Sequence, residues 1–185
     1  MRLLHTADLH LGRQFHGMSL EDDHAAILDQ ILQAINTHRP DVFIIAGDIF
    51  DRASPPATSV RQFNAFLGRV ARETEAAVVM IAGNHDSGDR IGAMSVLTDV
   101  RRALIRGPLL ADETPLILHD AAGPVAISAL PYGYEFAARD CFGDEFDRNA
   151  RTCHSRPGHR GAAASSGRSA LGRGCPRLCR GRQFQ

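Results

Sequence analysis

Short apolar runs alternate along the chain with longer segments in which apolar residues recur every three or four positions. The runs at 3–7, 42–46 and 77–82 hold few polar side chains, which is typical of strands buried on both faces of a sheet. Between them, apolar residues recur at helical spacing over 19–38 and 55–71. This β-α-β-α-β pattern predicts an α/β fold, a mainly parallel sheet covered by helices in layers.

Capping and helix-breaking residues predict where the two helices begin and end. Ser19 can cap the first helix, with Asp22 three residues further on. Pro40 ends that helix, and Pro55-Pro56 opens the second. Two further strands are predicted, at 116–119 and 125–129.

The charges divide the chain into two unlike parts. All 21 acidic residues lie at or before Asp147, and residues 1–147 have a formal charge of −9. Residues 148–185 contain arginine but no acid, and their formal charge is +9. Because this second part has very few large apolar side chains, it cannot offset the entropy lost on ordering. We therefore predict an N-terminal domain over 1–147 and a disordered tail over 148–185.

The sequence also indicates the cellular compartment in which the protein acts. No apolar run approaches the roughly 18 residues of a membrane span, and the N-terminus turns polar too early for a secretory signal. The four cysteines are scattered and resemble no disulfide framework. We expect a cytoplasmic protein.

Each of the three apolar runs is followed by residues of metal-binding type. Asp8 and His10 follow the first, Asp48 and Asp51 follow the second, and Gly83-Asn84-His85-Asp86 follows the third. Ligands of open α/β sheets gather beyond the carboxyl ends of the strands, so these segments should meet at one rim. Carboxylate, imidazole and amide ligands suit manganese, iron or zinc, and a metal pair can clamp both oxygens of a displacement at phosphorus.

The backbone at this rim can also be predicted. Asp8 and His10 should point the same way if the extended chain continues through them, and Gly47 and Gly83 would allow sharp turns. A nearby histidine could protonate the leaving oxygen. Each segment alone is typical of a polar loop, whereas their joint occurrence favours a metal centre.

Three longer strings resemble the first three motifs of calcineurin-like metallophosphoesterases: His5–Arg13, Gly47–Arg52 and Gly83–Ser87. They are most similar to the family of nuclease subunits of SbcCD-type DNA repair exonucleases, which Ser128–Gly133 also fits. The resemblance covers about residues 1–147.

The resemblance implies a role for each matching position. Asp8 and His10 would hold one metal, Asp48 would bridge, and Asn84 would hold the second. His85 would be the catalytic histidine. The implied cofactor is a pair of Mn²⁺ ions, and the implied activities are ATP-dependent exonuclease on double-stranded DNA ends and endonuclease on single strands. The implied partners are DNA, an SMC-like ATPase as the other component of the complex, and a second copy of the nuclease in a homodimer.

Three arginines follow the metal-ligand segments and should lie on the same rim. Guanidinium forks match phosphate geometry, so Arg13, Arg52 and Arg90 are candidate DNA contacts. The loop residue His16 is a fourth. Their alternative role is to brace loops or to form polar surface.

The chain also departs from the family pattern, which needs a later histidine and then a Gly-His-x-His segment. His119 ends a predicted strand in a different context, and His154 and His159 lie in the tail. The resemblance therefore implies that half of the metal cage is missing, together with the capping region and the partner-binding C-terminus.

A reading-frame slip would explain the composition of the tail. Reading the codons of 171–185 one base later permits an apolar strand that ends in histidine, which is the element the family places next. One alternative is a zinc site formed by Cys153, His159, Cys175 and Cys179. Another is a basic tail that binds DNA phosphates.

The function predicted from these residues is metal-dependent hydrolysis of DNA phosphodiester bonds. One alternative is a related phosphoesterase that acts on a small phosphodiester or a phosphoprotein. The other is an inactive fragment that only binds its partner or DNA.

Overall fold

The structure is a computed structural model, and it describes residues 1–97, 102–111 and 114–143. The predicted tail over 148–185 lies outside the described residues. The chain forms two compact units, 1–133 and 134–185. In the second unit the described helix is α4 (Glu135–Phe142).

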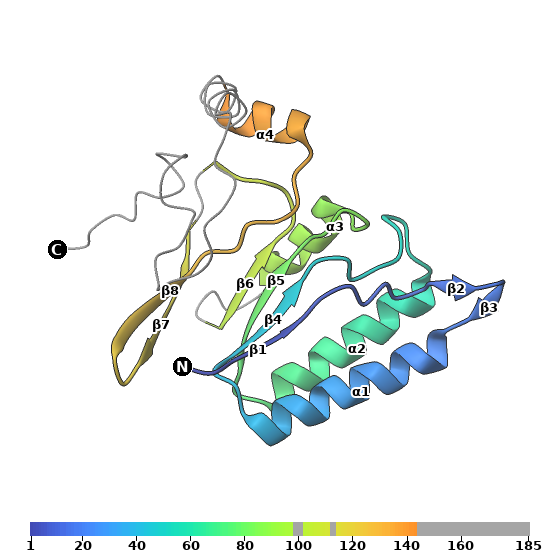
Figure 1. The fold of residues 1–185 in the computed structure, drawn as a ribbon, viewed down its shortest axis with the longest axis horizontal. Coiled ribbons are helices and arrows are strands. Elements are labelled where there is room, and N and C mark those ends of the chain that lie inside the picture. Colours follow the sequence, from blue (N-terminus) through green and yellow to red (C-terminus); the bar gives the residue numbers. More distant parts are fainter. Residues whose placement is uncertain (98–101, 112–113, 144–185) are drawn as a thin grey trace, which may run out of the picture. The chain divides into compact units, whose positions relative to one another are not determined.

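A parallel sheet of four strands forms the centre of the first unit (Figure 1). Along the sheet the order is β1 (Leu3–Thr6), β4 (Val42–Ala46), β5 (Ala77–Ile81) and β6 (Ala103–Arg106). Each strand pairs with the next strand of the sheet in chain order. Because parallel crossovers are right-handed, this order puts the connecting helices on one face.

Two long helices, α1 (Glu21–His38) and α2 (Ala57–Glu73), cover that face (Figure 1). Their apolar stripes pack on the sheet, since Leu32 of α1 and Phe63 of α2 belong to the same buried cluster as Phe43 of β4. Burying such side chains contributes about 1.5–3 kcal/mol each. The predicted helices are therefore confirmed.

The helix ends follow the predicted signals with one difference. α1 ends at His38, and Arg39 takes a left-handed conformation directly before Pro40. Leu20, not Ser19, is the cap residue of α1, although the Ser19 hydroxyl accepts a 3.2 Å hydrogen bond from the Glu21 amide. The prediction placed the start of the helix one residue early.

The opposite face of the sheet is covered by a β-hairpin rather than by helices. Its strands are β7 (Leu116–Asp120) and β8 (Gly123–Ile127). Leu116 packs with Val79 and Leu104 in a second, smaller buried cluster. The predicted α/β fold with a parallel sheet is confirmed, and the helices cover one face of it.

The pattern did not predict the shortest elements. These are β2 (Gln14–Phe15), β3 (Met18–Ser19), α3 (Gly88–Ala93), the 3₁₀ turn η1 (Met94–Leu97), and β6. The two-residue strands β2 and β3 are too short to show alternation, and α3 and η1 are too short to show a helical period. Within the described part of the chain, no helix is both long enough and apolar enough to cross a membrane.

Candidate metal centre

The three predicted segments meet beyond the carboxyl ends of β1, β4 and β5. Backbone hydrogen bonds continue past the strands. The Asp8 amide donates to the Gly47 carbonyl at 3.1 Å, and the His10 amide donates to the Asp48 carbonyl at 2.9 Å. The loop after β1 therefore runs alongside the loop after β4, and this pairing fixes the ligand residues relative to one another.

Asp8, His10 and Asp48 form one cluster at this rim. His10 Nε2 lies 3.9 Å from Asp8 Oδ1 and 4.0 Å from Asp48 Oδ2. Metal–ligand bonds of about 2.0–2.2 Å place two ligand atoms of one ion roughly 3–4.4 Å apart. These three side chains therefore fit a single divalent ion, and their oxygen and nitrogen ligands suit manganese, iron or zinc.

The backbone of the cluster is not extended. Asp8, His10 and Asp48 have φ angles of +56°, +45° and +49°. The prediction that Asp8 and His10 point the same way had a condition, an extended chain through both residues, and this condition is therefore not met. Pairing with the loop after β4 holds the chain in left-handed turns instead, and the side chains still gather at one place.

Two glycines allow the loops to approach. Gly47 has a φ of +84°, as the predicted turn requires. Gly83 has a different role, because a Cβ there would lie 2.1 Å from Asp48 Oδ1 and 2.3 Å from the Asp48 amide nitrogen. The absence of a side chain at Gly83 thus lets the loop after β5 touch Asp48.

The three cluster residues differ in exposure. The side chain of Asp48 is 13% exposed and that of His10 is 18% exposed, whereas that of Asp8 is 71% exposed. Asp48 Oδ1 accepts a 2.9 Å hydrogen bond from the His85 amide, so Oδ2 is the oxygen that faces His10. Asp48 is therefore the least exposed of the three side chains. Its role as a bridge between two metal ions stays a prediction.

His85 lies beside this cluster and is held by its neighbours. Its ring stands edge-on to the His10 ring, with centroids 4.9 Å apart. Its Nδ1 lies 2.9 Å from the Asp51 carbonyl oxygen and can donate to it. This hydrogen bond is the main reason why the pKa of His85 is raised, and the charges of Asp48 and Asp51 act in the same direction. Its other nitrogen, Nε2, is the one available for chemistry.

Asp51 takes part in the site, although the family resemblance assigned no role to this residue of metal-binding type. Its Oδ1 lies 3.7 Å from His10 Nδ1 and 4.0 Å from Arg13 Nε. Asp51, His10 and His85 form a second group whose ligand atoms lie within 4.8 Å of one another. The sequence feature that could have identified Asp51 as a site residue is its position beside Arg52 in the second motif.

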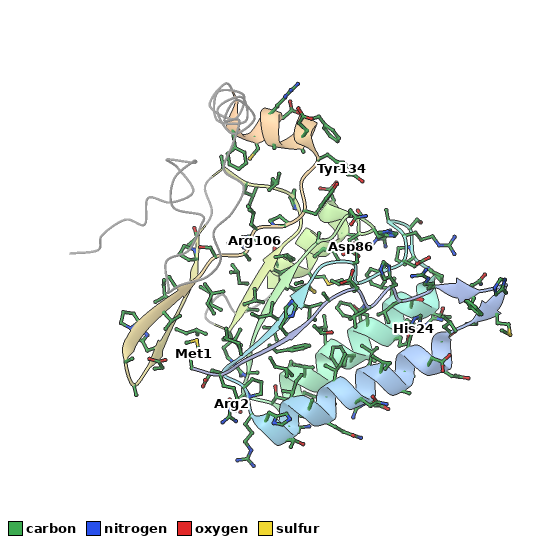
Figure 2. The ribbon with its side chains drawn as sticks, viewed as in Figure 1. Met1, Arg2, His24, Asp86, Arg106 and Tyr134 are labelled. Atoms are coloured by element: carbon green, nitrogen blue, oxygen red, sulfur yellow. The ribbon has the colours of Figure 1, made fainter. Side chains whose placement is uncertain are left out.

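Asp86 holds the loops of the rim together by hydrogen bonds. The family resemblance gave this residue no role either. Its carboxylate accepts hydrogen bonds from the amides of Ile49, Phe50 and Gly83, at 3.1, 2.9 and 2.9 Å. Figure 2 shows Asp86 at the carboxyl ends of the strands. One side chain thus ties the loop after β5 to the loop after β4.

The remaining predicted site residues are exposed. Asn84 precedes His85 on the loop after β5, and Arg52, Arg90 and His16 are exposed on their loops. Only Arg13 among the candidate DNA contacts has a carboxylate beside it within the described residues, that of Asp51. Their roles toward metal or DNA stay predictions.

His119 lies far from this rim. It lines a groove of about 780 Å³ together with Asp41, Ala76 and Arg102. Those three residues come directly before β4, β5 and β6, so the groove lies at the amino ends of the strands. His119 therefore does not replace the later histidines of the family pattern. The other candidates for that role, His154 and His159, lie outside the described residues.

A family model and several known proteins are similar to this chain, and their descriptions agree with one another. The family model for calcineurin-like phosphoesterases matches residues 1–151. The D component of the SbcCD nuclease of Bacillus subtilis is 32% identical over 154 residues, which is 83% of this chain and 39% of that protein. The protein of the same name from Escherichia coli K12 is 45% identical over 87 residues, 47% of this chain and 22% of the relative. That from Staphylococcus saprophyticus is 33% identical over 132 residues, 71% of this chain and 34% of the relative.

This chain thus spans 39% of the length of the Bacillus subtilis relative and less of the other two. The family match nevertheless includes all three strand-end segments, which the fold brings to one rim. The chain belongs to the calcineurin-like phosphoesterase family, whose members are hydrolases that use divalent metal ions.

Proposed function

We propose that this chain carries a nuclease site that hydrolyses DNA phosphodiester bonds with the help of divalent metal. The observation that supports this most is the cluster of Asp8, His10 and Asp48 beside a histidine that two hydrogen bonds hold in place. Relatives that share the segments are named as nucleases.

Asp8, His10 and Asp48 would hold one ion, which we propose is Mn²⁺, and the amide oxygen of Asn84 would contribute to a second. When bound, such ions lower the pKa of water and neutralise charge that develops on the phosphate oxygens. The buried Asp48 orients the set, because one of its oxygens is fixed by the His85 amide.

His85 would act on the leaving oxygen. Its Nδ1 proton is engaged by the Asp51 carbonyl, so the ring orientation is set and Nε2 can deliver a proton. The imidazolium form, which carries a proton on both ring nitrogens, is the form that can donate from Nε2. Arg13, His16, Arg52 and Arg90 would contact phosphates along the rim. Such local cations are needed because residues 1–147 carry a formal charge of −9.

The wider assembly is inferred from the relatives. We propose that the chain derives from the nuclease component of a two-component complex that acts in the cytoplasm with an ATPase, DNA and a second nuclease copy. Since it spans a minor part of its relatives, we expect the isolated chain to cleave slowly.

Single-turnover cleavage of an end-labelled single-stranded oligonucleotide tests the proposal, with Mn²⁺ or with EDTA. His85→Ala should reduce the rate about 10²–10⁴-fold, as expected for loss of a general acid. His119→Ala is the matched control, because this histidine lies at the other end of the sheet, and it should cleave like the unmodified chain.

Two outcomes would overturn the proposal. Cleavage of a small chromogenic diester without cleavage of DNA would favour the phosphoesterase alternative. Failure to cleave either substrate in Mn²⁺ would leave the chain as a fragment without this activity.

A further inference from the structure

A small hairpin connects the metal-binding loop to the first helix. Strands β2 and β3 are joined by a two-residue turn, His16-Gly17, whose φ angles are +50° and +81°. Positive φ at both positions is typical of the tight turns that join hairpin strands. In this register Phe15 stands directly opposite Met18, so both side chains lie on the same face of the hairpin.

That face is apolar and open to solvent. Phe15 is 59% exposed and Met18 is 62% exposed. The Phe15 ring has an edge contact with the His16 ring, with centroids 4.4 Å apart. Figure 1 shows the hairpin extending beyond the N-terminal end of α1. An apolar pair in this position adds nothing to the buried clusters, so it is available for contact with another molecule.

The hairpin lies close to the metal centre along the chain. Phe15 comes five positions after His10, so their Cα atoms lie at most about 17–18 Å apart. Arg13 stands between them, with its guanidinium beside Asp51 of the rim. Successive bases of a DNA strand rise about 3.4 Å. A strand held at the metal centre and running toward the hairpin would therefore reach it within about five nucleotides.

We propose that the β2–β3 hairpin is a base-stacking subsite, which rests on the nuclease function proposed above. Phe15, backed by Met18, would stack on an unpaired base of the strand whose phosphodiester lies at the metal centre. His16, whose ring contacts Phe15, and Arg13, which lies between Phe15 and the metal centre along the chain, would meet the adjoining phosphates. Aromatic rings beside cations are the usual means of binding single strands without sequence preference.

The chain contains no tryptophan, which gives a direct test. Phe15→Trp places a single indole on the hairpin, and stacking on a base should quench its emission when a deoxythymidine oligonucleotide is added in EDTA. Phe136→Trp is the matched control, because Phe136 is an exposed phenylalanine on α4, and its emission should not change.

Affinity gives a second measurement. By fluorescence anisotropy with the same oligonucleotide, Phe15→Ala should bind about 5- to 150-fold more weakly, which corresponds to the loss of one stacked base. Phe136→Ala should bind like the unmodified chain. Unchanged Phe15→Trp emission during binding, unchanged affinity of Phe15→Ala, or no binding at all would overturn the subsite.

The subsite and the nuclease function fail in different ways. Mn²⁺-dependent cleavage without quenching would overturn the subsite alone, whereas quenching without cleavage would overturn the nuclease function alone. If light scattering shows that Phe15→Ala converts a dimer to a monomer, the apolar face is an interface between copies, and the subsite is wrong.

Discussion

Asp8, His10 and Asp48 combine metal-ligand side chains with left-handed backbone. For a residue with a Cβ, this conformation costs roughly 1–2 kcal/mol, and it persists only where surrounding contacts enforce it. Here the amides of Asp8 and His10 are held by carbonyls of the loop after β4. The placement of the ligands therefore lowers the stability of the fold.

Replacing Asp8 separates these two effects, because its side chain is 71% exposed and packs little. Asp8→Gly and Asp8→Ala both remove the ligand, but only glycine relieves the left-handed backbone. We expect Asp8→Gly to be more stable than Asp8→Ala by about 1 kcal/mol in urea denaturation. Equal midpoints for the two variants would show that the backbone at Asp8 is not strained.

Sequence alone predicted which residue types gather at the rim but not how their backbone is held. Strand ends and motif spacing identify Asp8, His10 and Asp48. The φ angles depend on hydrogen bonds to another loop, which no local pattern contains. The same reason explains why Asp51 and Asp86 received no role: their partners are backbone and side-chain groups of other segments.

At the scale of elements, the loops after β4 and β5 act as one unit because of Asp86. Its carboxylate satisfies three amides that would otherwise lack a partner in a partly buried place. Hydrogen bonds to a charged group contribute about 1.5–3 kcal/mol each in favourable cases. The geometry of the rim therefore depends on a residue that touches no proposed ligand side chain in these contacts.

We expect Asp86→Ala to lower the free energy of unfolding by about 2 kcal/mol or more. Asp89→Ala, a change to an exposed acid three residues further along, is the control and should cost less than about 1 kcal/mol. Urea denaturation followed by circular dichroism measures both. Equal stabilities of the two variants would mean that the loops are held by other contacts.

The long elements were predicted because each contains several hydrophobic periods, as in α1 and α2. The β2–β3 hairpin was missed because each of its strands has only two residues, which is too short for a pattern to emerge. The covering of the sheet was also only partly predicted. Buried strands indicate that both faces are covered, but they do not say that β7 and β8 cover one of them.

At the scale of the whole first unit, the β7–β8 hairpin is joined to the sheet at the amino-terminal end of β1. The Met1 ammonium lies 2.9 Å from Asp120 Oδ2, which connects the start of β1 to the end of β7. Figure 2 shows Met1 at the end of the sheet opposite to Asp86. The hydrogen bond from the ammonium lowers the pKa of Asp120, and the same bond raises the pKa of the Met1 amino group.

These shifts define the pH range in which the pair stabilises the fold. The lowered pKa of Asp120 gives stability that is present above its ordinary value of 3.8 and is lost as pH falls through the folded value. The raised pKa of the amino group gives stability that is present below 8.0 and is lost as pH rises through the folded value. In an NMR titration, Asp120→Asn should return the amino pKa toward 8.0, and an unchanged value would contradict the pairing.

The central claim for the molecule is that its strand ends form a metal centre from Asp8, His10 and Asp48, with His85 beside it. Calorimetric titration with Mn²⁺ tests this most directly. We expect the chain to bind fewer than two ions, weakly, because the later ligands of the family pattern are not among its described residues. Asp48→Ala should abolish the binding heat, and His85→Ala should retain it. Two tightly bound ions, or binding that survives Asp48→Ala but not His85→Ala, would contradict the assignment.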